Sequence, residues 1–206
     1  QYTCKDRDGP PSEWHRVHYG SFGVGKAGVV ITEATAVEKQ GRITPHDLGI
    51  WTDEQADALA PITAFLREHG SVPAIQLAHA GRKASNSRPR DESGPVRPEE
   101  GGWPVVAPSD QPWPYDTPIE TKRLDQAGIG EIVDSFRASA RRARKAGFEI
   151  AEIHAAHGYL IHEFLSPVTN HREDDYGGDF EGRTRFAREV TAAVREVWPD
   201  DNPVFV

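Results

Sequence analysis

The sequence is poor in sulfur, with one cysteine, Cys4, and no methionine among 206 residues. A single thiol excludes an internal disulfide, and it favours a reducing, cytoplasmic location. Long apolar runs are also lacking, since none approaches the ~20 residues that a helix needs to cross a bilayer. We therefore expect no membrane partner.

Positive charge is scarce as well. Lys and Arg total 24 against 32 Asp and Glu, which gives a formal net charge of -8. Such a balance disfavours a nucleic-acid backbone as the partner, although it permits a small anionic cofactor in a local pocket. The length and the 37% apolar content suffice for one sizeable core. The composition is typical of a globular enzyme, and it leaves a homo-oligomer open.

Hydrophobic periodicity divides the chain into alternating helices and strands. The predicted elements are, in order, a helix over 12–25, a strand over 27–34, a helix over 52–70, a strand over 72–77, a helix ending at 147, a strand over 148–153, a helix over 179–198 and a strand from 202 onward. Trp14, Val17 and Phe22 recur on one face of the first helix. The β-branched run over 27–34 is typical of a strand buried on both faces. Residues 78–122, rich in Pro, Gly and Ser, form a long connection.

The alternation predicts an α/β fold with right-handed βαβ units and a parallel sheet. An open doubly wound sheet and an eight-fold barrel both fit that order. No Gly-x-Gly-x-x-Gly follows any predicted strand, which weakens the dinucleotide-binding open sheet. Polar clusters follow the strand ends, where barrel active sites are assembled. We predict a (β/α)8 TIM barrel, here truncated to roughly its first half, strands 2–5 with their helices.

Both ends indicate part of a longer protein. The chain begins at Gln1 and stops at Val206, inside an apolar run. A strand with nothing after it to pair with or cover it is unusual. We expect residues 1–206 to be one partial domain, incomplete at both ends.

The loop after the predicted strand over 148–153 holds His154, His157 and Tyr159 within six residues. Three interpretations compete. The histidines could be hydrogen-bonded structural residues, or they could bind zinc with Glu152 or Glu163, although the usual zinc spacings are absent. Alternatively, two imidazole N–H groups could stabilise negative charge on a carbonyl oxygen while the phenol supplies a proton. The third interpretation requires an organic cofactor, because no side chain delivers a hydride.

Several ordered motifs carry a family resemblance. They are Glu33-Ala-Thr-Ala-Val37, Gly41-Arg-Ile-Thr44, Ile75-Gln-Leu-Ala-His-Ala-Gly-Arg-Lys83, Val106-Ala-Pro-Ser109, Glu152-Ile-His-Ala-Ala-His-Gly-Tyr-Leu160 and Asp175-Tyr-Gly-Gly178. Over nearly the whole chain, the sequence resembles the Old Yellow Enzyme family of flavin-dependent ene-reductases. The His–His pair and the Gln-Leu-Ala-His-Ala-Gly-Arg segment are similar to its bacterial, thermophilic-type branch.

The resemblance implies an FMN-binding barrel that uses NADPH or NADH. It implies that the flavin contacts Ala34 and Gln76, with His154 also nearby. His154 and His157 would hold the carbonyl oxygen of an enone-type substrate, Tyr2 would contact that substrate, and Tyr159 would be the proton donor. The implied reaction is ping-pong: NAD(P)H reduces FMN, and hydride then reaches the β-carbon of an activated alkene while the α-carbon is protonated.

The sequence also departs from the family pattern. The family's flavin-tuning cysteine would immediately precede Gln1, so Cys4 does not inherit that role. The family's phosphate-binding residues would lie beyond Val206, and we expect these 206 residues alone to bind FMN poorly. A larger parent related to 2,4-dienoyl-CoA reductases, a metal-dependent barrel hydrolase and an inactive fragment stay open as alternatives.

Overall fold

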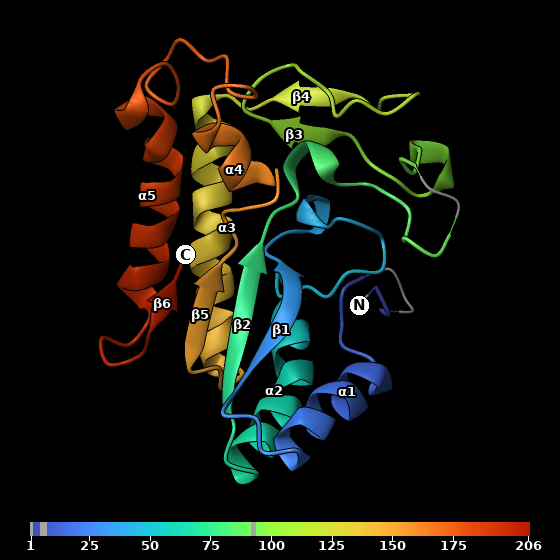
Figure 1. The fold of residues 1–206 in the computed structure, drawn as a ribbon, viewed down its shortest axis with the longest axis vertical. Helices are drawn as coiled ribbons and strands as arrows, with labels where there is room; N and C mark the ends of the chain where they lie inside the picture. Colours follow the sequence, from blue (N-terminus) through green and yellow to red (C-terminus); the bar gives the residue numbers. More distant parts are fainter. Residues whose placement is uncertain (1, 5–7, 92–93) are drawn as a thin grey trace.

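A computed structural model describes residues 2–4, 8–91 and 94–206, and Figure 1 shows its architecture. The α-helices are α1 (Glu13–Val24), α2 (Asp53–Glu68), α3 (Gln126–Lys145), α4 (Leu160–Leu165) and α5 (Phe180–Val197). The strands are β1 (Val29–Ala36), β2 (Val72–Ala78), β3 (Val105–Ala107), β4 (Thr121–Arg123), β5 (Ile150–Ile153) and β6 (Val204–Phe205). Short 3-10 turns cover Lys39–Gly41, Gly81–Lys83 and Pro98–Glu100.

The main sheet has four strands in the order β1-β2-β5-β6, and all its pairs are parallel. The sequential strands are joined through helices, as the predicted βαβ units require. All four strands point toward the same end of the molecule, where β3, β4 and α4 lie (Figure 1). The carboxyl ends of the strands therefore share one edge with the long connection.

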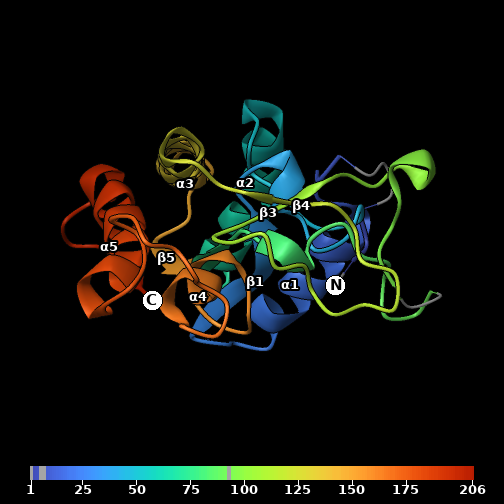
Figure 2. The same ribbon diagram turned by 90° about the horizontal axis from the view of Figure 1, so that it is seen from above.

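One face of this sheet is covered by α2 and α3, which Figures 1 and 2 place on the same side of the strands. The predicted apolar stripes supply the contact, and their buried members include Leu59, Ile62, Ile129, Phe136 and Ala140. A cap defines where α2 begins, because the side chain of Thr52 accepts from the backbone N–H of Gln55. Within the described ranges, no helix is long and apolar enough to span a membrane.

The predicted face of α1 is wrong. Trp14, Val17 and Phe22 are exposed, with relative accessibilities of 53%, 70% and 44%. The buried side instead carries His15, Tyr19, Gly20 and Gly23. Glycine allows α2 to approach closely: a Cβ at position 20 would lie 3.3 Å from the ring of Phe65. His15 Nε2 also lies 2.7 Å from Glu33 Oε1, and this buried contact and the close approach of α2 together decide the orientation of the helix.

The prediction that the first strand is buried on both faces is also wrong. In β1, Val30 is buried against the helices, whereas Val29 and Ile31 are 47% and 41% exposed. In the register of the sheet, Ile31 pairs with Ala74 and then Ile150, so these side chains share the second face. That face lies opposite α2 and α3.

Three elements were not predicted. Residues 78–122 contain β3 and most of β4, which pair in parallel and form a separate two-stranded sheet. The predicted loop after β5 contains α4. Short elements of three to six residues give too little periodicity to be recognised in a sequence.

Candidate active site

The loops that follow β2 and β5 are joined by backbone hydrogen bonds at the carboxyl edge of the sheet. His154 N–H donates to the carbonyl of Leu77 at 2.9 Å, and Leu160 N–H donates to the carbonyl of His79 at 3.0 Å. These bonds extend the parallel pairing past the strand ends. The loop carrying the two histidines and Tyr159 is therefore fixed against the loop carrying Gly81–Lys83.

The two histidines are brought together. His154 Nε2 lies 3.2 Å from His157 Nδ1, and the ring planes meet at 74°. Burial, with the neighbouring His157 charge second, lowers the pKa of His154, so it is neutral at physiological pH. Its Nδ1 accepts the backbone N–H of Ala156, which places its proton on Nε2. In this arrangement the His154 Nε2–H faces His157 Nδ1, so the pair holds its imidazole N–H groups together at the strand end.

Tyr159 is the N-cap residue of α4, and its ring packs edge-on against His154 with centroids 4.9 Å apart. Burial is the first cause that raises its pKa to about 12, and the neighbouring Tyr2, Asp47 and Tyr115 add to it. The half-buried phenol is consequently protonated at neutral pH. Tyr2 adopts a left-handed backbone with φ 57°, and it lies near enough to Tyr159 to contribute to the raised pKa of that phenol.

Ala34 and Gln76 occupy matching positions in neighbouring strands, since Ala34 pairs with Gln76 and Gln76 pairs with Glu152. All three side chains therefore lie on the face opposite the helices. Gln76 Nε2 donates to Glu152 Oε2 at 3.1 Å, which orients the amide. An amide offers one donor group and one acceptor, as the pyrimidine edge of a flavin requires, and an alanine methyl leaves room for a flat ring. These residues fit FMN.

Cys4 is fully buried, and its backbone pairs with His46. Burial raises the pKa of the thiol to about 12, so it is neutral and unreactive at physiological pH. The expectation that Cys4 has no flavin-tuning role rests on the resemblance, and its buried thiol gives no reason to change it.

Sequence reasoning left Lys83 without an assigned role, although a basic pair at this place could approach a cofactor. Its Nζ donates to the carbonyl of His157 at 3.0 Å and lies over the rings of Trp113 and Tyr159, at 4.6 and 4.9 Å from their centroids. The neighbouring Arg82 donates from Nη1 to the carbonyl of Gln111 at 3.0 Å. The only signal in the sequence was a basic pair just past a strand end.

The zinc hypothesis gains no support from the carboxylates. Glu152 is engaged with Gln76, and Glu163 accepts the backbone N–H of Arg82 at 3.0 Å, away from the histidine pair. Among the residues that the structure describes, no three His, Cys, Asp or Glu side chains are grouped as metal ligands. That hypothesis therefore lacks a complete ligand set in this part of the chain.

Glu163 lies beneath the site. It is 1% exposed, and its Oε2 has no hydrogen-bonding protein partner. Burial raises its pKa from an ordinary value of 4.5 to about 8, although the N–H and charge of Arg82 act the other way. A buried carboxyl that prefers the neutral form stabilises the folded protein less as it ionises.

The stability of the protein should therefore fall as the pH rises from about 4.5 to about 8, because the folded state holds a proton that the unfolded state has released. Glu163→Gln keeps an acceptor for the Arg82 N–H and removes the ionisation. We expect the variant to lose much of this decline. Urea unfolding at several pH values measures it, and an unchanged decline in the variant would assign it to other groups.

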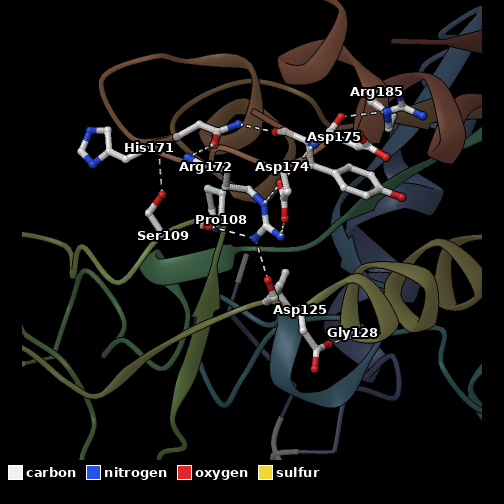
Figure 3. Close-up of polar contacts among 12 residues, drawn as sticks. Pro108, Ser109, Asp125, Gly128, His171, Arg172, Asp174, Asp175 and Arg185 are labelled. Atoms are coloured by element: carbon white, nitrogen blue, oxygen red, sulfur yellow. Dashed lines mark hydrogen bonds and ion pairs between the residues drawn. The ribbon is translucent and has the colours of Figure 1, made fainter. Parts of the chain in front are cut away.

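A second polar network holds the loop between α4 and α5, and Figure 3 shows it. The guanidinium of Arg172 makes two hydrogen bonds to Asp174, at 2.9 and 2.6 Å. It also donates to the carbonyl groups of Pro108 and Leu124, at 3.0 and 2.6 Å. One buried cation thus joins the loop after α4 to the ends of β3 and β4.

A parallel sheet whose strand ends carry an imidazole pair and a phenol defines a barrel-type α/β enzyme with its site at the carboxyl edge. The chain belongs to the NADH:flavin oxidoreductase / NADH oxidase family, whose model matches residues 1–206. It is 47% identical over 205 residues to the NADPH dehydrogenase of Geobacillus sp. (strain WCH70), covering 100% of this chain and 55% of that protein.

The solved structures that are similar to it include two Old Yellow Enzyme relatives. The Old Yellow Enzyme homologue from Zymomonas mobilis has 33% sequence identity and a TM-score of 0.82, and the match covers 99% of this chain and 56% of that one. Morphinone reductase in complex with tetrahydroNAD has 30% identity and a TM-score of 0.83, with 99% and 56% covered. The chain spans about half the length of the curated relatives it matches.

The predicted family and the truncated α/β barrel are thereby confirmed. FMN with a nicotinamide reductant, expected from the resemblance, is the cofactor chemistry of this family. The roles of individual residues stay predictions.

Proposed function

We propose that the whole protein is an FMN-dependent NAD(P)H oxidoreductase that reduces the activated C=C bond of α,β-unsaturated carbonyl compounds. In this proposal, residues 1–206 supply part of the FMN-binding barrel and the substrate-activating groups. The observation that carries the proposal is that His154, His157 and Tyr159 lie next to one another. Their loop starts at the end of β5, two residues after Glu152, which binds the Gln76 amide.

The imidazole pair acts on the carbonyl oxygen of the substrate. Negative charge grows on that oxygen only as hydride reaches the β-carbon, so N–H donors aimed at it stabilise the transition state more than the ground state. A neutral His154 is suited to this task because its Nε2–H, once turned from His157 Nδ1 to the substrate oxygen, donates a hydrogen bond without carrying a charge into a partly buried site.

Tyr159 supplies the proton for the α-carbon. Its raised pKa, about 12, keeps it protonated until a strongly basic carbon forms, and it then gives up the proton to that carbon. Tyr2, which contributes to the raised pKa of Tyr159, would contact the substrate.

Ala34 and Gln76, with His154 beside them, would hold the flavin ring. When bound, FMN supplies the hydride, which it takes from NADPH or NADH. Glu152 keeps the Gln76 amide in place by accepting from its Nε2, so the ring edge meets a fixed donor and acceptor.

The test is an anaerobic two-step experiment on the purified whole protein. We expect one FMN per chain, loss of flavin absorbance on adding NADPH or NADH, and its return on adding cyclohexenone or a maleimide, with the saturated product formed. If NADPH or NADH reduces the bound flavin but an enone does not reoxidise it, the ene-reductase proposal is wrong. A colourless, zinc-containing protein would favour the metal-dependent hydrolase.

A further inference from the structure

Lys83 has an unusual environment for a lysine near a surface. Its half-buried ammonium lies between two aromatic rings, 4.6 Å from the centroid of Trp113 and 4.9 Å from that of Tyr159. A cation near an aromatic ring is attracted to the ring's negative face. Tyr159 is the predicted proton donor, so a fixed positive charge lies next to the group that becomes negative during catalysis.

The position of this ammonium is determined from the β5 side by one hydrogen bond. Nζ donates to the carbonyl of His157 at 3.0 Å. His157 has φ 57°, a left-handed conformation that residues with a Cβ rarely adopt, and Gly158 continues the turn with φ 72°. This turn directs the His157 carbonyl to the lysine, and Tyr159 comes directly after Gly158 in the chain.

From the other side, the long connection supplies Trp113, and Arg82 helps to hold it. Arg82 Nη1 donates to the carbonyl of Gln111 at 3.0 Å, and its guanidinium lies 5.4 Å from the centroid of Trp113. These contacts place the indole over the Lys83 ammonium. A Cβ at Gly158 would lie 3.7 Å from both the Trp113 ring and the Lys83 Cδ, so the three groups are in van der Waals contact range.

We propose that Lys83 is a positioning residue whose ammonium, held between Trp113 and the His157 carbonyl, stabilises the phenolate that Tyr159 becomes when it protonates the substrate. This inference rests on the proposed function. In the step, the O–H bond of Tyr159 breaks and its electron pair stays on the phenol oxygen. The basic α-carbon, formed after hydride transfer from the reduced flavin, binds the proton with its own electron pair. Lys83 keeps its protons throughout.

Burial makes the ionisation of Tyr159 costly, the carboxyl group of Asp47 adds to the cost, and Tyr2 and Tyr115 would add to it if they ionised. A neighbouring cation offsets this effect, and it acts only on the step in which the phenolate forms. The reduction of FMN by NAD(P)H does not involve Tyr159 as a proton donor, so Lys83 should influence only the second half-reaction.

The test compares Lys83→Met, which keeps a long apolar stem, with Lys83→Arg, which keeps the charge, in the whole FMN-loaded protein. With Lys83→Met, we expect the rate of enone reduction in rapid-mixing experiments to fall roughly 5- to 30-fold, with the solvent deuterium isotope effect increased. Lys83→Arg should recover most of the rate. Reduction by NADPH should change by less than about twofold in both variants.

A double-mutant cycle separates this mechanism from a purely structural role. Tyr159→Phe has no phenolate to stabilise, so adding Lys83→Met to it should cost less than about twofold further. Losses that multiply in the double variant, or an equal loss in both half-reactions, would overturn the inference. Lys122→Met, at an exposed lysine on β4, is the matched control and should behave as wild type.

The two proposals fail in different ways. If the wild-type protein does not reduce an enone, the proposed function is wrong. If the wild-type protein and Tyr159→Phe behave as proposed but Lys83→Met matches wild type, only the role of Lys83 is wrong.

Discussion

Replacing Tyr159 by phenylalanine should slow alkene reduction roughly 100- to 10,000-fold while sparing the reduction of FMN by NAD(P)H, because general acid catalysis contributes rate factors of that size. The ring of Tyr159 packs on His154 with centroids 4.9 Å apart, and phenylalanine keeps this contact. No hydrogen bond of the Tyr159 hydroxyl to another described residue stabilises the fold, so the variant should stay folded. The expected loss of rate is therefore confined to the step in which Tyr159 transfers its proton.

Stopped-flow measurement of each half-reaction checks this prediction. Equal losses in the two half-reactions would remove the proton-donor assignment and favour a general effect on cofactor binding. Tyr176→Phe is a matched control, since that phenol donates to Glu189 at 3.0 Å, outside the site. It should leave both rates within about twofold of wild type.

The part of the site that the sequence predicted is the part that is contiguous in sequence. His154, His157 and Tyr159 lie within one loop, so residue types alone indicated their chemistry. Lys83 could not be assigned in this way. It meets His157 across 74 positions of the chain, and the contact depends on a left-handed backbone at His157 that no sequence pattern specifies.

The fold shows the same division. Periodicity predicted α2, α3 and α5 with their buried faces, since each buries a continuous apolar stripe. It failed for α1, whose buried side contains His15, bonded to Glu33 at 2.7 Å, and two glycines that admit α2. A hydrophobic pattern does not reveal that a buried hydrogen bond and a close helix approach outweigh the burial of three apolar side chains.

Arg172→Ala should have the largest effect on stability, roughly 2–4 kcal/mol, because it removes a buried guanidinium that binds two carbonyl groups and the partly exposed carboxylate of Asp174. The side chain is 1% exposed and bonds Asp174 with two of its nitrogens. Its removal would also leave the carbonyl groups of Pro108 and Leu124 without this donor, in a buried environment. The network in Figure 3 would lose its central cation, so the loop after α4 would lose its attachment to β3 and β4.

Urea denaturation of the whole protein measures the loss, and Arg188→Ala is the matched control. Arg188 pairs with Glu181 on α5, but both side chains are about 70% exposed, so the control should cost less than about 1 kcal/mol. Arg172 also lowers the pKa of Asp174, which adds stability that disappears as the pH falls through the folded-state pKa. Arg172→Ala should therefore flatten the acid decline, and a small, pH-independent loss equal to that of the control would show that the network does not hold this loop.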